Sequence, residues 1–284
     1  MNRVAIFGGS GYLGSQLAAY YAAEGVAHDV FDMPSFDVTR AECWSSFKPP
    51  DYSAILFFAG MTGTEKSFIE ADRFLDVNEC GLLNLLTRLA PLGEQAPKII
   101  FPSTRLVYRG SEEPLTEDAP KEAKTVYAAN KLACEYLLQA YHVRYGIPYA
   151  VVRICVPYGS LVSADYSYGT IGFFLKQAEM GGPITLYGDG SVRRTFTHVA
   201  DICRIVHRLV EVQSVGIFNV GGNTYSLREV AELIAASNGG GVDFLPWPRV
   251  AERLESGSTF FDASLLTTIV GGSRYRDIRM DMFG

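Results

Sequence analysis

A tyrosine and a lysine four residues apart, Tyr127 and Lys131, are the first pair in this sequence that could do chemistry. In a helix, residues i and i+4 lie on one face, so the two side chains would be neighbours. An ammonium group beside a phenol stabilises the phenolate, which lowers the pKa of the tyrosine towards working pH. The spacing therefore predicts an acid/base tyrosine, although a partly buried tyrosine beside a solvated lysine would show the same spacing.

Two hydroxyl side chains, Ser103 and Thr104, end the apolar segment KIIFPST at 98–104, just ahead of this helix. Such a segment is typical of a buried strand, and ligands of parallel sheets bind at the carboxyl ends of the strands. A hydroxyl there could hydrogen-bond the same substrate oxygen that Tyr127 protonates or deprotonates. The two segments together predict a reaction site at this strand end.

Three glycines near the N-terminus, Gly8, Gly11 and Gly14, lie between an expected strand and an expected helix. Glycines in this context permit a tight turn and let the backbone and the helix N-terminus approach a pyrophosphate. The string fits the GxxGxxG spacing and, from Gly9, also GxGxxG. It predicts a dinucleotide site, with a glycine-rich turn that binds nothing as the alternative.

Asp32 ends the second expected strand, about 20 residues after the glycines, where a carboxylate accepts hydrogen bonds from the adenosine ribose hydroxyls. A 2′-phosphate would be repelled by this carboxylate. The following residues, 33–35, offer no arginine or lysine to receive it. The position therefore favours NAD as cofactor, with a solvent-facing aspartate as the alternative.

Short apolar runs alternate with longer segments of helical period, which indicates βαβ units around a parallel sheet. The fold class expected is α/β, a Rossmann-type doubly wound parallel sheet with a smaller C-terminal substrate-binding lobe. The expected strands are 3–8, 28–32, 53–60, 98–104, 149–155 and 216–221, and the expected helices are 12–25, 66–92, 125–146, 199–212 and 226–238. Ser226 and Glu229 predict a capping box at the start of the last helix.

The alternation weakens after Pro157, where isolated glycine and proline breaks become frequent. We therefore expect a dinucleotide-binding domain at 1–157, with 191–222 returning to it. Residues 158–190 and 223–284 are expected to form the small lobe.

The composition excludes several classes of function. The 284 residues are 48% hydrophobic, enough for a large core, and the formal net charge of -6 comes without the basic runs that bind nucleic acid. No apolar stretch is long enough to span a membrane and no export signal begins the chain. Five cysteines without a CxxC pair indicate reduced thiols in a cytoplasmic protein. His198 and Asp201 lack a third ligand at suitable spacing, so no metal is expected.

With these motifs in order along nearly the whole chain, the sequence resembles an extended short-chain dehydrogenase/reductase of the NAD-dependent epimerase/dehydratase family, the nucleotide-sugar enzymes. The stretches that carry the resemblance are GGSGYLG, FFAG, FLDVNECGLLNLL, PSTRLVY, YAANK, YGDGSVRRTFTHVADI and FNVGG.

The resemblance implies a role for individual residues. Thr104 would share the substrate oxygen, Tyr127 would be the base, and Lys131 would bind the nicotinamide ribose and tune Tyr127. The residues expected to bind the cofactor are Gly8, Gly11, Tyr12, Leu13, Gly14, Asp32, Ala59, Gly60, Asn78 and Lys131, and those expected to bind the substrate are Ser103, Thr104, Arg194 and Arg253. Arg194 would hold the substrate pyrophosphate, which suits a guanidinium, and Arg253 would be a second clamp. The alternative for Arg194 is a surface arginine.

The sequence departs from the family pattern at two places. Arg105 and Leu106 follow Thr104 where family dehydratases carry an Asp-Glu pair, which argues against 4,6-dehydration. Val156 replaces the usual asparagine in RICVPYG, which removes a substrate contact or leaves it to another group. The tyrosine of that segment, Tyr158, is retained, and the alternative to a functional role is that its ring only packs against its neighbours.

The resemblance favours a cytoplasmic NAD-dependent epimerase of a nucleotide-activated sugar, acting through a transient keto intermediate. An NAD(P)H-dependent reductase of a 4-keto-deoxy sugar nucleotide would use the same residues, and a non-catalytic dinucleotide-binding protein is the alternative from another class. The resemblance also implies a homodimer through helices 66–92 and 125–146. Their apolar residues could face a second copy or the core: Leu82, Leu85, Leu86, Leu137, Leu138 and Tyr141.

Overall fold

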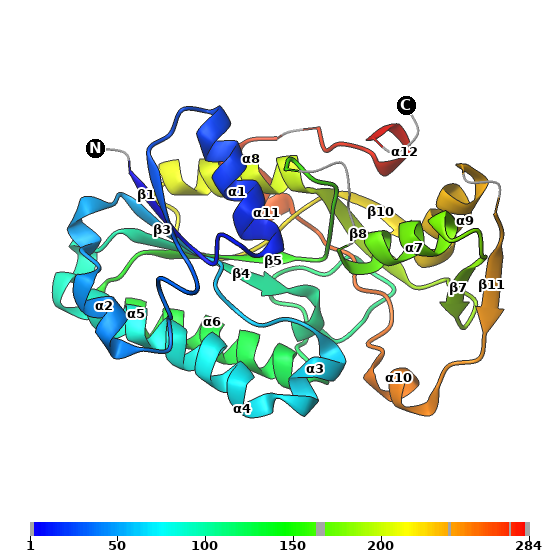
Figure 1. Ribbon diagram of the computed structural model, residues 1–284, viewed down its shortest axis with the longest axis horizontal. Helices are drawn as coiled ribbons and strands as arrows, with labels where there is room; N and C mark the ends of the chain where they lie inside the picture. The colour runs from blue at the N-terminus through cyan, green and yellow to red at the C-terminus, as the bar shows by residue number, and fades with distance from the viewer. Residues whose placement is uncertain (1–2, 163–167, 238–239, 273, 282–284) are drawn as a thin grey trace.

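The computed structural model describes residues 3–162, 168–237, 240–272 and 274–281 (Figure 1). Its main sheet has the strand order β2-β1-β3-β4-β5-β9, with every neighbouring pair parallel. The strands are β1 (Val4–Phe7), β2 (His28–Phe31), β3 (Ala54–Phe57), β4 (Lys98–Thr104), β5 (Tyr149–Ile154) and β9 (Gly216–Asn219). The α/β, Rossmann-type fold class is confirmed, and each expected strand lies where the apolar runs indicated.

Helices cover both faces of this sheet (Figure 1). On one face lie α1 (Tyr12–Ala23), α8 (Val199–Glu211) and α11 (Ser264–Val270), and on the other α2 (Ala41–Ser46), α5 (Gly81–Leu89) and α6 (Val126–Tyr145). Thr125 caps α6 by accepting a hydrogen bond from the Ala128 amide at 3.0 Å, and Gly146 ends it at a φ of 77°. The central strands are therefore buried on both sides, as their continuous apolar sequences require.

The helix expected over 66–92 is wrong as a single element. The chain forms α3 (Thr64–Ile69), α4 (Ala71–Phe74), a π-helical turn η2 (Leu75–Cys80) and then α5. Glu70 departs from helical geometry with φ -117° and ψ 41°, which separates α3 from α4. The apolar residues that could have faced a second copy belong to the core instead: Leu82, Leu85, Leu86 and Leu138 are buried, and Leu137 and Tyr141 are partly buried against them.

The small lobe has two sheets of its own. Strands β6 (Val156–Tyr158), β8 (Arg193–His198) and β10 (Asn223–Ser226) form one, and β7 (Ile184–Tyr187) pairs with β11 (Val242–Leu245) in the other. The sequence predicts that the chain returns to the main sheet at residue 191. Because β8 pairs with β6 and β10, the chain rejoins the elements of the main sheet only at α8. The remaining elements are α7 (Gly169–Glu179), α9 (Leu227–Ser237), α10 (Arg249–Leu254), α12 (Ile278–Asp281), and the short turns η1 (Pro49–Asp51), η3 (Ala90–Gln95) and η4 (Arg105–Val107).

The expected capping box of α9 is present. The Ser226 amide donates to a Glu229 carboxylate oxygen at 2.7 Å, and the Glu229 amide donates to the Ser226 hydroxyl at 3.1 Å. All five cysteines are free thiols, and Cys134, Cys155 and Cys203 are buried.

A buried ion pair joins α6 to the sheet. Arg153 on β5 donates from Nε and Nη2 to the two carboxylate oxygens of Glu135 on α6, at 3.0 and 2.6 Å. The Ser103 hydroxyl at the end of β4 donates to the same carboxylate at 2.5 Å. Arg153 also donates to the Tyr108 hydroxyl, which in turn donates to Asn219 of β9 at 2.7 Å. The pair thereby ties together one helix and three strands.

The substitution Glu135→Gln tests this pair, because it leaves the Arg153 charge buried without its counter-charge. We expect the free energy of unfolding, measured by urea denaturation, to fall by about 3 to 5 kcal/mol. The control is Glu232→Gln, which breaks the exposed Arg228–Glu232 pair and should cost less than about 1 kcal/mol. Equal losses in the two variants would contradict the role given to Glu135.

Candidate active site

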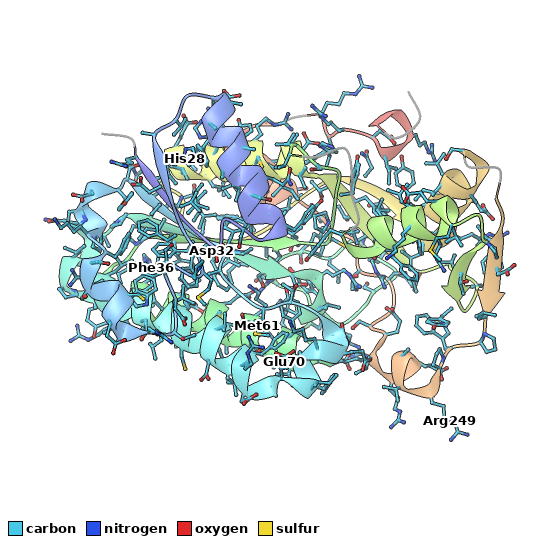
Figure 2. All side chains as sticks on the ribbon, in the orientation of Figure 1. His28, Asp32, Phe36, Met61, Glu70 and Arg249 are labelled. Atoms are coloured by element: carbon cyan, nitrogen blue, oxygen red, sulfur yellow. The ribbon has the colours of Figure 1, made fainter. Side chains whose placement is uncertain are left out.

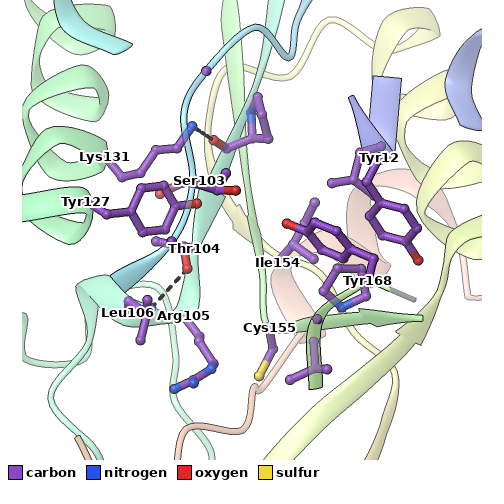
Figure 3. A pocket seen from close by; sticks show the side chains of 18 of the residues that line it. Tyr12, Ser103, Thr104, Arg105, Leu106, Tyr127, Lys131, Ile154, Cys155 and Tyr168 are labelled. Atoms are coloured by element: carbon purple, nitrogen blue, oxygen red, sulfur yellow. Dashed lines mark hydrogen bonds between the residues drawn. The ribbon is translucent and has the colours of Figure 1, made fainter. Parts of the chain in front are cut away.

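A cavity of about 470 Å³ opens at the carboxyl ends of the main strands (Figure 3). Its walls come from both lobes: residues 11–14 after β1, Phe58, Gly60 and 62–64 after β3, 102–106 at the end of β4, Tyr127 and Lys131 of α6, and 154–157 and 168–170 at the small lobe. The segments expected to carry the cofactor site and the reaction site therefore border one cavity.

Two glycines of the loop after β1, Gly8 and Gly14, are packed too closely against backbone atoms to carry side chains. Gly8 has a φ of +84°, and a Cβ there would lie 2.4 Å from the Ala59 amide nitrogen. A Cβ on Gly14 would lie 2.0 Å from the Gly8 carbonyl oxygen. Helix α1, which begins after Gly11, has no side-chain cap and no acidic residue in its first turn. Its N-terminus thus has no competing acidic side chain and suits an anion.

Asp32 fixes the other side of this loop. Its carboxylate accepts hydrogen bonds from the amide and the hydroxyl of Ser10, both at 2.6 Å, and from the Met33 amide at 2.8 Å. The half-buried carboxylate stands beside the glycine loop, where a ribose would have to be recognised.

Asn78 positions the backbone segment that follows β3. From the π-helical turn η2 its side chain accepts from the Met61 amide at 2.7 Å and donates to the Met61 carbonyl at 3.1 Å. A Cβ on Gly60 would lie 3.0 Å from the Asn78 side-chain oxygen. Figure 2 shows Met61, the partner of Asn78, in the interior of the view near Asp32, whereas Arg249 of α10 lies at the outer edge. Asn78 therefore acts through the 59–61 backbone, and the described cavity walls do not include it.

Thr104, Tyr127 and Lys131 meet on one wall of the cavity (Figure 3). The Lys131 ammonium donates to the Pro102 carbonyl at 2.8 Å and lies 5.9 Å from the centre of the Tyr127 ring. Thr104 accepts from the Leu106 amide at 3.2 Å, which caps η4 and fixes its hydroxyl. The three residues that the motifs proposed as catalytic are brought together by β4 and the first turns of α6.

The sequence predicts a lowered pKa for Tyr127, and this prediction is wrong for the protein without its ligands. Burial raises the pKa of Tyr127 above its ordinary value, the nearby Tyr168 adds to this, and a hydrogen bond with Thr104 lowers it only in part. Burial also lowers the pKa of Lys131 to about 8. Because Lys131 points its ammonium at Pro102, its charge does not offset the burial of the phenol.

The expected substrate-binding residues lie in different surroundings. The Ser103 hydroxyl is used by Glu135, which leaves Thr104 as the hydroxyl beside Tyr127. Arg194 is 1% exposed and pairs with Glu255 at 2.7 Å, while it also donates to the Gly257 carbonyl. Arg253 is exposed on α10. Neither arginine is among the described residues that line the cavity.

Sequence reasoning missed one wall of the cavity. The Tyr168 ring stacks on Tyr12 with centroids 4.1 Å apart, and the Tyr12 hydroxyl donates to the Gly159 carbonyl at 2.7 Å. These contacts join α1 to the small lobe across the cavity. Tyr168 lies in an irregular segment without periodicity, so no pattern in the sequence could have placed it there.

His198 and Asp201 have structural roles. The His198 ring nitrogen accepts from the Ala200 amide at 3.1 Å and caps α8, and Asp201 pairs with Arg204 at 2.8 Å in the first turn. The Tyr158 ring packs edge-on against His198. Within the described ranges no three potential ligands cluster as a metal site would require. None of the helices described there is long and apolar enough to cross a membrane.

The model of the NAD dependent epimerase/dehydratase family matches residues 4–221. The chain belongs to this family. It is 30% identical over 208 residues to the UDP-glucuronate 4-epimerase of Thermodesulfobacterium geofontis, a match that covers 72% of this chain and 63% of that enzyme. It is 27% identical over 298 residues to the dTDP-L-rhamnose 4-epimerase of Burkholderia thailandensis, covering 84% of this chain and 81% of that enzyme.

A solved structure agrees with this assignment. The structure of the UDP-glucose 4-epimerase of Thermus thermophilus in complex with NAD superposes on this chain with a TM-score of 0.79 and 25% sequence identity. The superposition covers 94% of this chain and 92% of that chain. Membership in the epimerase/dehydratase family assigns NAD as the cofactor. The residues of this chain suit NAD. The glycine loop and the start of α1, which has no side-chain cap, suit a pyrophosphate, and Asp32 suits a ribose.

The buried position of Lys131 gives a pH dependence of stability. Its pKa is about 8 in the folded chain and 10.5 ordinarily, so between these values the unfolded chain binds more protons. The contribution of Lys131 to the free energy of unfolding therefore increases as the pH rises through this window and is lost as the pH falls through about 8.

We expect the free energy of unfolding of the wild type, minus that of Lys131→Met, to be larger at about pH 10 than at about pH 7. Urea denaturation at the two pH values measures it. Lys98, whose pKa burial also lowers to about 8, is present in both proteins, so its contribution cancels. A difference that does not change with pH would show that Lys131 keeps an ordinary pKa.

Proposed function

We propose that this protein is an NAD-dependent epimerase that acts on a nucleotide-activated sugar through a transient keto intermediate. The observation that supports this most is the convergence of Thr104, Tyr127 and Lys131 on the cavity that the glycine loop also borders. The nucleotide-sugar epimerases among the relatives support the same class of substrate.

In the proposed reaction, Tyr127 receives the proton of a sugar hydroxyl while the Thr104 hydroxyl hydrogen-bonds the same oxygen. NAD, when bound, supplies the acceptor and then the donor of the hydride of that carbinol carbon. Because burial raises the pKa of Tyr127, its phenolate needs the positive charge of Lys131 close by. After the keto sugar has rotated in the site and presents its other face, Tyr127 returns its proton to the oxygen. Lys131 lies one helical turn further along α6 and would also hold the ribose of the cofactor.

The residues after Thr104 favour epimerisation over dehydration. Arg105 and Leu106 both line the cavity where an acid pair would be needed to eliminate water. A guanidinium and an aliphatic side chain are poor proton donors and acceptors at neutral pH. The same three residues would serve a reductase of a 4-keto-deoxy sugar nucleotide, so the fate of the cofactor has to separate the two reactions.

Replacing Tyr127 by phenylalanine removes only the hydroxyl. We expect turnover of the sugar nucleotide to fall by at least about 100-fold, since the general acid/base is lost, while NAD affinity stays within about threefold. Turnover is measured by chromatography of the sugar nucleotides and NAD affinity by calorimetry. Tyr136→Phe, on the exposed face of the same helix, is the matched control. Normal turnover by the Tyr127 variant would overturn the assignment.

The cofactor content of the purified protein distinguishes an epimerase from a reductase. An epimerase regenerates NAD in each cycle, so we expect about one NAD per chain after denaturation and assay of the supernatant, and activity without added cofactor. An empty protein that oxidises added NADH or NADPH with a 4-keto sugar nucleotide would instead identify a reductase. A protein that binds NAD but turns over neither class of substrate would support the non-catalytic alternative.

We also propose a homodimer through α6 and the segment 64–89. Apolar side chains are exposed on these neighbouring elements, among them Ile69 (81%) and Val143 (80%). Such residues would be covered by the same face of a second copy. The substitution Ile69→Lys should shift the protein to monomers in sedimentation equilibrium, and Met180→Lys, just after α7, should not. A monomeric wild type would contradict the proposal.

A further inference from the structure

The charges on the cavity wall are of one sign. Among the described residues that line it, Lys131 and Arg105 are cationic and none is a carboxylate. Lys131 stands beside Tyr127 and uses its ammonium on the Pro102 carbonyl. Arg105 comes directly after Thr104, and Figure 3 shows its side chain on the other side of Thr104 from Lys131.

The arginine that the family motif points to, Arg194, is already occupied. Its guanidinium donates to Glu255, to the Gly257 carbonyl and to the carbonyl of Arg193, and the residue is 1% exposed. An anion that took the place of Glu255 at Arg194 would break this largely buried ion pair at a substantial cost.

The side chain of Arg105, in contrast, makes few interactions. Within the described part of the chain, its side chain makes one hydrogen bond, from Nη1 to the Thr259 hydroxyl at 3.2 Å, and forms no ion pair with a carboxylate. Burial, together with the neighbouring charge of Arg194, lowers the pKa of Arg105 to about 10, so the guanidinium is charged at neutral pH but poorly compensated. A guanidinium has five N–H donors, of which most are left for a ligand.

We propose that Arg105 binds an oxyanion of the substrate in this cavity. This rests on the proposed function, because it concerns the sugar nucleotide bound in the same cavity. The Arg194–Glu255 pair is joined to the Gly257 carbonyl, and neither residue is among the described residues that line the cavity. The oxyanion is either the diphosphate of the nucleotide or a carboxylate on the sugar, since a planar guanidinium binds both in the same two-pronged way.

A structural role for Arg105 makes a different prediction. If the hydrogen bond to Thr259 were its purpose, removing that bond from either side would have the same effect. Thr259 is fully buried and its hydroxyl accepts this bond from Arg105, so Thr259→Val keeps its shape and removes only the acceptor. The proposal requires Thr259→Val to bind the substrate as the wild type does.

The experiment compares wild type, Arg105→Met, Arg105→Lys and Thr259→Val, with Arg109→Met as control because Arg109 is exposed on the same loop. Calorimetry measures the affinity for UDP, UDP-glucose, UDP-glucuronate, dTDP and dTDP-glucose in the presence of saturating NAD. Arg105→Met should lose about 10- to 100-fold in affinity for at least one of these anions. Arg105→Lys should fall between wild type and Arg105→Met, while Thr259→Val and Arg109→Met should bind as the wild type.

The ligands separate the two sources of the oxyanion. Equal weakening of UDP and of both UDP sugars places Arg105 at the diphosphate, whereas weakening of UDP-glucuronate alone places it at a sugar carboxylate. Unchanged affinities in Arg105→Met, or losses of the same size in Thr259→Val, would overturn the proposal. Should Arg105→Met not fold, as judged by NAD affinity, Arg105→Lys carries the same comparison. A wild type that binds none of the five ligands would refute the proposed function itself.

Discussion

The buried ion pair between Glu135 and Arg153 is the interaction on which the site depends. It connects α6, which carries the tyrosine proposed as the acid/base, to β5, while Ser103, which lines the cavity, extends it to β4. Two charges removed from water hold their geometry strictly, because either one alone would be very costly to bury. The pair therefore helps to fix α6, which carries Tyr127, against the strand end that carries Thr104.

The cofactor end of the cavity is organised by close backbone packing rather than by charge. The glycine loop fits between β3 and α1 because its glycines have no side chains, and Asn78 and Asp32 fix the segments on either side of it. Both side chains use several hydrogen bonds on the backbone of the chain itself. A rigid glycine loop that leads into the N-terminus of a helix is what a bound pyrophosphate requires.

The sequence was sufficient for the parts of the molecule that local patterns determine. Continuous apolar runs located the six strands of the main sheet, and the motifs named Thr104, Tyr127 and Lys131, which meet at the cavity. It was not sufficient where residues far apart in the chain decide the outcome. The break in the helix over 66–92, the pairing of β8 with β6, and the capture of Arg194 by Glu255 all depend on contacts that no window of sequence contains.

Three consecutive residues at the end of β4 show how one strand supplies several parts of the site. Ser103 donates its hydroxyl to Glu135, whereas the hydroxyl of Thr104 lies beside Tyr127, so the two neighbours serve different partners. The turn η4 then begins, and Arg105 reaches Thr259 in the small lobe. The hydroxyl beside Tyr127 and the guanidinium on the other side of Thr104 from Lys131 thus come from consecutive residues of one strand end.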